Sequence, residues 1–333
     1  MIAALIGLGR WGPRMIPKLL EHPMVDDIHC YDTDRSRMTG VVRKFPGLKT
    51  ASDYESILHN GRIEAVIIAT SAASHYPLAR QALEQGKHVF VEKPLSIKAS
   101  QAQHLVELAS ARGLKLMVDH ITVYSGMART IKELIDAKEM GRLLYVDCVR
   151  ASLGIIQSDV SVVWDLAVHE FALIDYLLNE KPIAVSATGS VFYGTLEEIA
   201  YATLFFDAGL TVHVHVSWLS PIRVRRLMIS GTKKMLVFDD TLPDNKITLF
   251  DRGVEGKRMA DLHEPPFTYR DGASRVLAYD RTEPMATLIN DFFGAIAEDR
   301  QPLTNGAQGL RIVKLLEAVE ESIKKQGVRV KPT

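Results

Sequence analysis

The fold is decided by the stretch IAALIGLGRWGP, residues 2–13. Its apolar start predicts a buried strand from Ile2 to Ile6, and Pro13 suits the first turn of a helix. Between them the glycines follow a GxGxxG pattern. The first glycine permits a tight turn, the second lets backbone approach a pyrophosphate, and the third allows close packing of helix on strand. The stretch therefore predicts a dinucleotide-binding βαβ unit with Gly7, Gly9 and Gly12 in its phosphate loop.

The predicted second strand, Ile28 to Tyr31, is followed directly by Asp32, about 20 residues after the last of these glycines. A carboxylate at this position accepts hydrogen bonds from the adenosine ribose and repels a 2′-phosphate, so NAD is the expected cofactor. Arg35 and Arg37 lie near enough in sequence to leave NADP open. A simple helix-cap role for Asp32 is less favoured, because the next two residues can cap the following helix equally well.

The first 120 residues alternate short apolar runs with helical patterns, which is typical of a parallel sheet built from βαβ units. Ser100 is expected to cap a helix from Gln101 to Arg112, and Gly113 to end it in a left-handed conformation. Besides the first two strands, we expect strands at Ala65 to Ala69, His88 to Val91 and Lys115 to Val118.

The remaining residues have a different pattern. A helix from Met127 to Ala137 precedes longer alternating strands, of which Leu210 to Trp218 is the clearest, with Val212, Val214, Val216 and Trp218 on one face. Further strands are expected at Val185 to Phe192, Ile199 to Phe206, Val224 to Ser230 and Met235 to Phe238, and closing helices at Met285 to Ala297 and Ala307 to Lys325.

We therefore predict an α/β protein of two domains. Residues 1–120 form an NAD-binding Rossmann domain with a doubly wound parallel sheet. Residues 121–333 form an α+β domain with a large, mostly antiparallel sheet, for substrate binding and oligomerisation. The last helices are free to pack back on the N-terminal domain.

The composition narrows the class of partner and the compartment. Forty basic residues balance forty acidic ones, so no excess charge points to nucleic acid or an anionic membrane. The two cysteines, Cys30 and Cys148, give no disulfide framework. The N-terminus lacks the pattern of an export signal, and no stretch has the roughly 20 apolar residues of a membrane span. We expect a cytoplasmic protein.

The run Glu92-Lys93-Pro94 follows the strand His88 to Val91, at the edge of a parallel sheet that faces the ligand crevice. The segment GKHVFVEKPL, residues 86–95, resembles the EKP signature of the Gfo/Idh/MocA family of dehydrogenases. A lone Glu-Lys-Pro is more often a solvated turn, but this context favours function. The resemblance implies that Lys93 contacts both the substrate hydroxyl and the cofactor. The expected cofactor-binding residues are then Gly7, Gly9, Arg10, Trp11, Gly12, Asp32, Thr70, Ser71, His75, Glu92 and Lys93.

A second polar element lies in the segment from Val162 to Leu178, which is apolar nearly all round and predicts a buried helix. Asp165 and His169 share one face of it, and burial without partners would cost roughly 1 to 3 kcal/mol each. They indicate a polar cavity, or else a satisfied core pair. The family resemblance implies a DxxxH element here, with His169 as acid–base catalyst and Asp165 orienting the substrate.

The resemblance covers nearly the whole chain and extends to a subgroup of predicted dehydrogenases associated with sugar-nucleotide and surface-polysaccharide enzymes. The segments that carry it are GRWGP (9–13), SDV (158–160), WDLA (164–167) and VSW (216–218). The sequence departs from the family at Ser125, Ile155 and Val168, which border the expected substrate pocket. The implied catalytic set is Lys93, Asp165 and His169, and the substrate-binding set adds Tyr124 and Arg150. Arg150 is equally compatible with an exposed strand position.

Four functions remain open at this point. The first is a dehydrogenase acting on a ring hydroxyl of a sugar or sugar nucleotide. The others are an inositol or free-sugar dehydrogenase, an NAD-dependent glycosidase without net redox change, and a non-enzymatic NAD-binding regulator, which the retained site residues disfavour. His213 and His215 share a strand face but have no third metal ligand at a recognisable spacing. We expect that face to pair subunits into a homodimer or homotetramer, as the family resemblance implies.

Overall fold

The computed structural model describes residues 1–256 and 267–333. The chain divides into two compact units. Unit one comprises Met1–Ser125 and Thr282–Lys314, and unit two comprises Gly126–Arg281 and Leu315–Thr333. Both units are built from segments that are distant in the sequence, because the chain passes from the first to the second and back, and the last helix begins in unit one and ends in unit two.

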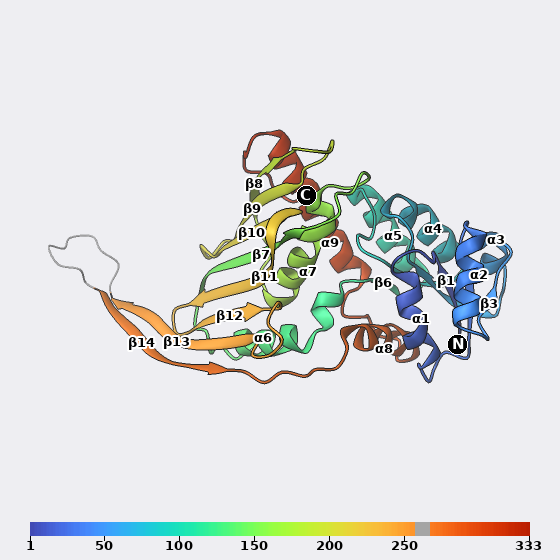
Figure 1. Ribbon diagram of the computed structural model, residues 1–333, viewed down its shortest axis with the longest axis horizontal. Helices are drawn as coiled ribbons and strands as arrows, with labels where there is room; N and C mark the ends of the chain where they lie inside the picture. Colours follow the sequence, from blue (N-terminus) through green and yellow to red (C-terminus); the bar gives the residue numbers. More distant parts are fainter. Residues whose placement is uncertain (257–266) are drawn as a thin grey trace. The chain divides into compact units, whose positions relative to one another are not determined.

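Unit one contains a six-stranded sheet in which every neighbouring pair is parallel, in the order β3-β2-β1-β4-β5-β6. Figure 1 labels β1, β3 and β6 of this sheet. The chain moves outward from β1 to β2 and β3, and then returns to β4 on the other side of β1. Such a switch point opens a crevice at the carboxyl ends of the strands. The strands are β1 (Ile2–Ile6), β2 (Asp27–Tyr31), β3 (Lys49–Thr50), β4 (Ile63–Ile68), β5 (His88–Val91) and β6 (Leu116–Val118).

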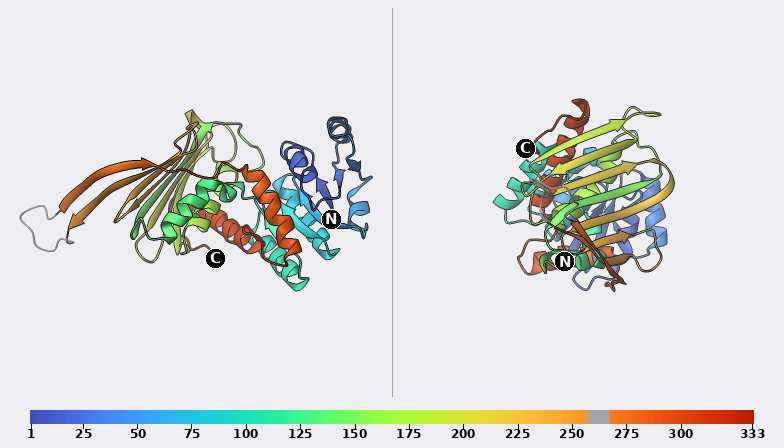
Figure 2. Two further views of the ribbon diagram at one scale, coloured as in Figure 1. Left: turned by 90° about the horizontal axis from the view of Figure 1, so that it is seen from below. Right: turned by 90° about the vertical axis from the view of Figure 1, so that its left-hand side faces the viewer.

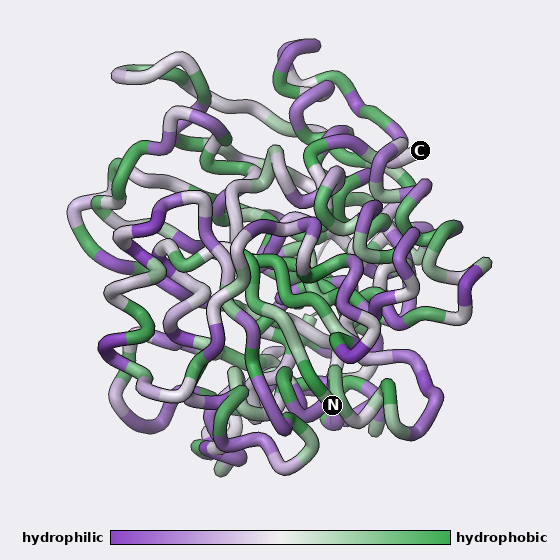
Figure 3. The backbone as a smooth tube through the Cα atoms, turned by 90° about the vertical axis from the view of Figure 1, so that its right-hand side faces the viewer, coloured by the Kyte–Doolittle hydropathy of each residue, from purple (hydrophilic) through white to green (hydrophobic). Residues whose placement is uncertain are grey.

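The core of unit one is completed by a helix from the far end of the sequence. Helix α8 (Pro284–Ala297) packs on α1, and its Phe292 ring lies 5.6 Å from Phe90 of β5 between centroids. The strands beside the N-terminus are strongly hydrophobic (Figure 3), and all five residues of β1 are buried. The other helices are α1 (Gly12–Leu20), α2 (Arg35–Lys44), α3 (Tyr54–Leu58), α4 (Ala72–Glu84), α5 (Ala99–Ala111), η1 (Ile121–Tyr124) and α9 (Gly306–Lys324).

The predicted strands and the Rossmann-type fold of this unit are confirmed, while one helix cap is wrong. Gly113 has φ +65°, as expected after α5. Ser100, however, lies inside the first turn of that helix. The carbonyl of Lys98 already accepts the first helical hydrogen bonds, from Gln101 (3.1 Å) and Ala102 (3.0 Å), so Lys98 is the N-cap.

Unit two contains an eight-stranded sheet in the order β14-β13-β12-β11-β7-β10-β9-β8. Its neighbours are antiparallel except for the parallel pair β7 and β10, which confirms a mostly antiparallel sheet. The strands are β7 (Leu143–Leu153), β8 (Ala184–Ser190), β9 (Ile199–Phe205), β10 (Thr211–Ser217), β11 (Leu219–Gly231), β12 (Met235–Asp239), β13 (Ile247–Gly256) and β14 (Phe267–Val276). Strands β7, β13 and β14 were not anticipated.

Helices lie on one face of this sheet, and among the described residues no helix covers the other face (Figure 2). The covering elements are α6 (Gly126–Asp136), η2 (Val163–Ala167) and α7 (Val168–Leu177). The alternation predicted for β10 is confirmed, because Val212, Val214 and Val216 are buried while His213 and His215 are half-buried. None of the helices in the described part of the chain has the length and apolar character required to cross a membrane.

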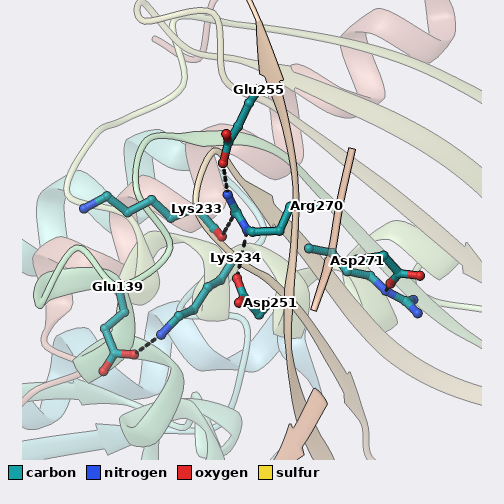
Figure 4. A network of polar contacts seen from close by, with 8 residues as sticks. Glu139, Lys233, Lys234, Asp251, Glu255, Arg270 and Asp271 are labelled. Carbon is teal, nitrogen blue, oxygen red and sulfur yellow. Dashed lines mark hydrogen bonds and ion pairs between the residues drawn. The ribbon is translucent and has the colours of Figure 1, made fainter. Parts of the chain in front are cut away.

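The outer hairpin of the sheet, β13 and β14, is tied to its neighbours by a polar network (Figure 4). Arg270 donates to Asp251 (2.9 Å), to Glu255 (2.5 Å) and to the Lys233 carbonyl. Lys234 beside them donates to Glu139 at 2.8 Å. Exposed ion pairs of this kind contribute little stability individually, so the network chiefly aligns the two strands.

Candidate active site

In the glycine loop between β1 and α1, two of the three glycines stand where any side chain would collide with the backbone. Gly7 has φ +93°, and a Cβ at this position would lie 2.5 Å from the Ala69 carbonyl oxygen. A Cβ on Gly12 would lie 2.0 Å from the Gly7 carbonyl oxygen. Neither space exists for a side chain, so both glycines are required for the turn and for close packing against β4.

Gly9 is different, because the protein itself does not require it. A Cβ there would meet no atom of the described residues closer than Arg37 Nη1, at 3.7 Å. Helix α1 begins just beyond it, and within the described chain Trp11 provides no side-chain cap for the helix N-terminus. The open side of Gly9 and the uncapped amides fit a pyrophosphate. These residues therefore fit the dinucleotide that the sequence predicts.

Asp32 joins the end of β2 to this loop. It is 7% exposed, and its Oδ2 accepts the Leu8 amide at 2.7 Å while its Oδ1 accepts the Asp34 amide at 2.8 Å. The cap of α2 is Asp34, whose side chain accepts the Ser36 amide at 2.9 Å. Arg37 Nη1 lies 3.7 Å from Asp32. Asp32 thus holds the glycine loop in place at the end of β2.

The loops after β4 and β5 are connected by His75 of α4. Its Nδ1 lies 2.7 Å from the Pro94 carbonyl oxygen and its Nε2 lies 3.2 Å from that of Thr70. Burial lowers the pKa of His75, so the ring is neutral and has a single N–H, which the shorter contact assigns to Nδ1. Thr70 in turn accepts a hydrogen bond from Ser74 at 2.7 Å, and Ser71 is the N-cap residue of α4. His75 of α4 is therefore bonded to the loop after β5.

Lys93 stands half-buried at the carboxyl end of β5, next to a pair of buried carboxyl groups. Glu92 accepts the Lys93 amide at 3.2 Å, and Asp119 follows β6, the next strand of the sheet. Burial raises the pKa of Glu92 well above its usual value, and the charge of Asp119 raises it further. Asp119 was not predicted, since neither its type nor its spacing marks it in the sequence.

In unit two, Asp165 lies in the π-helical turn η2, and His169 in the first turn of α7. Asp165 Oδ2 accepts the indole N–H of Trp218 at 3.1 Å. The segment is largely buried, as predicted, while Asp165, Leu166 and His169 are half-buried. They form an accessible stripe on an otherwise buried element, and π-helical turns are often found at functional sites.

The partner of Asp165 is itself rigidly held. Trp218 is 2% exposed, and a Cβ on Gly154 would lie 3.0 Å from its ring. The Trp218 amide donates to the Glu198 carbonyl at 2.9 Å. The buried Glu198 carboxylate accepts three loop amides, from Phe192 (2.5 Å), Tyr193 (3.0 Å) and Gly194 (2.5 Å). Glu198 thus orders the loop beside Trp218. This role of Glu198 was not identified from the sequence.

Two predicted substrate-binding residues also have protein partners. The Tyr124 hydroxyl, in unit one, donates to Asp291 at 2.7 Å and accepts the Thr304 amide at 3.2 Å. Arg150, in unit two, donates from Nε to the buried Glu170 at 2.5 Å and is therefore no exposed strand residue. Both side chains stabilise their own units.

His213 and His215 lie on the uncovered face of the sheet. His213 Nδ1 is 3.2 Å from Asp147, and the Tyr201 ring stacks on His215 with centroids 4.5 Å apart. Within the described residues no three His, Cys, Asp or Glu side chains form a group that could bind a metal ion. The two histidines therefore belong to a ladder of stacked side chains.

The sequence also matches two family models. Residues 1–120 match the oxidoreductase family with NAD-binding Rossmann fold, and residues 128–237 match the GFO/IDH/MocA C-terminal domain. Together they account for most of the chain. The first match covers the strands and loops that carry the glycine loop and Lys93.

Two of the similar proteins name an inositol or a nucleotide-linked sugar as their substrate. The chain is 26% identical over 260 residues to scyllo-inositol 2-dehydrogenase (NAD(+)) of Bacillus subtilis, covering 74% of this chain and 75% of the relative. It is 25% identical over 252 residues to UDP-N-acetylglucosamine 3-dehydrogenase of Acidithiobacillus ferrooxidans, covering 75% and 76%.

Solved structures agree in fold. A crystal structure of the A. ferrooxidans UDP-N-acetylglucosamine 3-dehydrogenase superposes with a TM-score of 0.82 at 21% identity, covering 98% of each chain. An oxidoreductase from Agrobacterium radiobacter in complex with NAD+, L-tartaric acid and magnesium gives 0.82 at 18% identity, covering 100% of this chain and 98% of that one. With both domain models matched and the glycine loop formed, the chain belongs to the GFO/IDH/MocA family and is an NAD-binding dehydrogenase.

Proposed function

We propose that the protein oxidises or reduces a ring carbon of a sugar or sugar nucleotide, with NAD as hydride carrier. The observation that carries the proposal is the position of Lys93. It stands at the carboxyl end of β5, on the sheet edge from which the glycine loop and Asp32 also project. A cation at this edge is suited to stabilise negative charge on a substrate oxygen.

The residues that would hold the cofactor lie in the glycine loop and at the end of β2. The open face of Gly9 and the first amides of α1 would take the pyrophosphate, and Asp32 the adenosine ribose. NAD, when bound, supplies the acceptor or donor of the hydride. Arg37, 3.7 Å from Asp32, leaves NADP as a second cofactor.

The proton chemistry is assigned to unit two. In the oxidative direction, His169 accepts the proton of the substrate hydroxyl while the adjacent carbon loses its hydride. Asp165 orients that hydroxyl, and Trp218 fixes the carboxylate through its indole N–H. Lys93 stabilises the developing alkoxide. Tyr124 is left out, because its hydroxyl already donates to Asp291 and accepts the Thr304 amide. Arg150 stays a substrate-binding candidate, since its bond to Glu170 engages Nε alone.

The proposed substrate class rests on the substrates that the similar proteins are named for. UDP-N-acetylglucosamine 3-dehydrogenase and a dTDP-sugar 3-reductase of Streptomyces antibioticus, 31% identical over 130 residues, both act on nucleotide-linked sugars by name. The similarity to scyllo-inositol 2-dehydrogenase makes an inositol or free sugar the second candidate. The same side chains would serve either substrate.

Subunit pairing through the uncovered sheet face is part of the proposal. That face carries Tyr145, 48% exposed, and Tyr201, 41% exposed, beside the half-buried histidines of β10. Exposed aromatic side chains on an open sheet favour a homodimer or homotetramer. Cys30 and Cys148 are both free and buried, which suits the proposed cytoplasmic location.

A thermal-shift screen tests the function. NAD, NADH, NADP and NADPH are added alone and then with UDP-, GDP- and dTDP-sugars, inositols and free hexoses, because a bound ligand raises Tm by mass action. We expect NAD(H) to stabilise, and a nucleotide sugar both to stabilise further and to change absorbance at the NADH band. Stabilisation by cofactor with turnover of inositols alone would select the second candidate. Cleavage of a glycoside without net NADH formation would favour a redox-neutral glycosidase.

A further inference from the structure

Two carboxyl groups from neighbouring strands meet inside unit one. Glu92 directly follows β5 and Asp119 directly follows β6, and the preceding residues Val91 and Val118 are paired in the sheet. Glu92 is 6% exposed and Asp119 is 3% exposed. Their carboxyl groups are close enough for a side-chain hydrogen bond to form between them once one of them carries a proton. Backbone pairing sets their approach, since the Asp119 amide donates to the Val91 carbonyl at 2.8 Å.

A hydrogen bond between two carboxyl groups requires a proton on one of them. Glu92 Oε1 and Asp119 Oδ1 are buried, and in the described residues no N–H or O–H group of another side chain or of the backbone donates to either atom. If both groups were ionised, the two carboxylates would repel each other, because they are buried away from water. With one proton between them, each unsatisfied oxygen gains its partner. Burial raises the pKa of both Glu92 and Asp119, which favours retention of a proton by the pair.

The charge near this pair is balanced by one cation. Lys93 is the described positive group whose charge acts on both carboxyls, and it lowers the pKa of each. Two imidazoles border the group. His75 is neutral and bound to the Pro94 carbonyl, and His120 directly follows Asp119. A pair that holds one proton carries a single negative charge, which matches the single positive charge of Lys93.

We propose that Glu92 and Asp119 share one proton and act together as a singly charged counter-ion that positions the Lys93 ammonium for the dehydrogenase reaction. The part played by Lys93 in that reaction rests on the proposed function. The shared proton does not, because it follows from two buried carboxyls at hydrogen-bonding distance. Neither carboxyl is a catalytic residue in this proposal, since both act through Lys93.

Infrared spectroscopy tests the proton directly. A protonated carboxyl group has a C=O stretching band above the amide I region, which shifts in D2O and disappears on ionisation. We expect wild-type protein at neutral pH to show this band, and Glu92→Gln and Asp119→Asn each to lose it. Glu320→Gln is the matched control, because burial also raises the pKa of Glu320, which lies in unit two. Absence of the band in wild type, or its survival in both amide variants, would overturn the shared proton.

A stability cycle tests the counter-ion. Each single amide variant keeps one negative charge beside Lys93, whereas the double variant keeps none. We expect the double variant to lower Tm by about 3 °C more than the sum of the two single shifts. Adding Lys93→Met to the double variant should then restore part of the loss, although Lys93→Met alone lowers Tm or leaves it unaltered. Additive shifts without rescue would refute the counter-ion, since a purely structural hydrogen bond gives no charge rescue.

These measurements separate the two proposals. Neither the carboxyl band nor the Tm cycle needs a substrate or a cofactor. If the ligand screen finds no redox turnover while the band and the rescue are present, the proposed function fails and the carboxyl pair stands. If turnover is found but the band is missing, the proposed function stands and the shared proton fails.

Discussion

The indole N–H of Trp218, at the end of β10, donates to the Asp165 carboxylate at 3.1 Å. The two residues are far apart in the sequence, and the contact fixes one oxygen of a proposed substrate-orienting side chain. Because Trp218 is buried against Gly154, the donor has little freedom to move. The arrangement leads to the first of five predictions.

Trp218→Phe removes the donor while keeping most of the aromatic packing. We expect kcat to fall by roughly 10- to 150-fold, because losing one hydrogen bond to a charged group costs roughly 1.5 to 3 kcal/mol. Trp164→Phe is the matched control, since Trp164 is also buried and bonds Glu320 instead. Steady-state kinetics with the substrate found in the ligand screen measures both. Equal losses in the two variants would show that aromatic packing, and not Asp165, is responsible.

Lys93→Ala should abolish turnover, with a loss of at least about 100-fold, while NAD binding largely survives. The reason is that the ammonium stabilises charge that develops on the substrate oxygen. Lys98→Ala, which changes an exposed lysine nearby, serves as the control. Turnover assays and NADH fluorescence titrations measure the two effects. A Lys93→Ala enzyme with near-normal turnover would remove Lys93 from the mechanism.

Gly9→Ala and Gly12→Ala should separate cofactor binding from folding. The space beside Gly9 has room for a methyl group, so Gly9→Ala should keep the Tm of the ligand-free protein. It should bind NADH at least about tenfold more weakly, because the methyl group would occupy the space of the pyrophosphate. A Cβ at Gly12 would collide with the Gly7 carbonyl, so Gly12→Ala should lose stability by several °C. If Gly9→Ala bound NADH normally, the open side would not be the pyrophosphate site.

Asp32→Ala should weaken NAD much more than NADP, because the carboxylate binds the ribose hydroxyls and repels a 2′-phosphate. Some loss for both cofactors is expected, since the Leu8 amide also loses its acceptor. Asp34→Ala is the control, because the Asp34 carboxylate caps α2, whereas the Leu8 amide donates to Asp32. Calorimetric titrations of the two cofactors give the ratio. Equal losses of NAD and NADP affinity would contradict the ribose assignment.

The raised pKa of Glu92 predicts a pH dependence of stability. Between the usual carboxyl value of 4.5 and the raised value, the folded state binds more protons than the unfolded state. The free energy of unfolding therefore decreases as pH rises through this window, by up to about 1.4 kcal/mol per pH unit. In Glu92→Gln this contribution is absent. Denaturation series from pH 4.5 upward compare the two proteins, and parallel curves would mean that Glu92 is ionised throughout.

Local sequence patterns determined the framework of the protein. The apolar run from Ile2 to Ile6, the glycine spacing and Pro13 act within a dozen residues, and strand, turn and helix form as they predict. The alternation in β10 likewise specifies which side chains face the core. The EKP segment indicated the edge at which Lys93 stands. These inferences succeeded because helix and strand periodicity is a short-range property of the chain.

Only the tertiary structure decided which polar groups meet. Asp119 pairs with Glu92 because β5 and β6 are neighbours in the sheet, and Trp218 reaches Asp165 because β10 packs near η2. Tyr124 is occupied because the chain returns to unit one and delivers Asp291 to its hydroxyl. Spacing along the sequence cannot indicate such contacts, since they depend on strand order and on where the chain returns. Burial then converts each contact into a hydrogen bond or a shared proton, because a polar group away from water must find a partner.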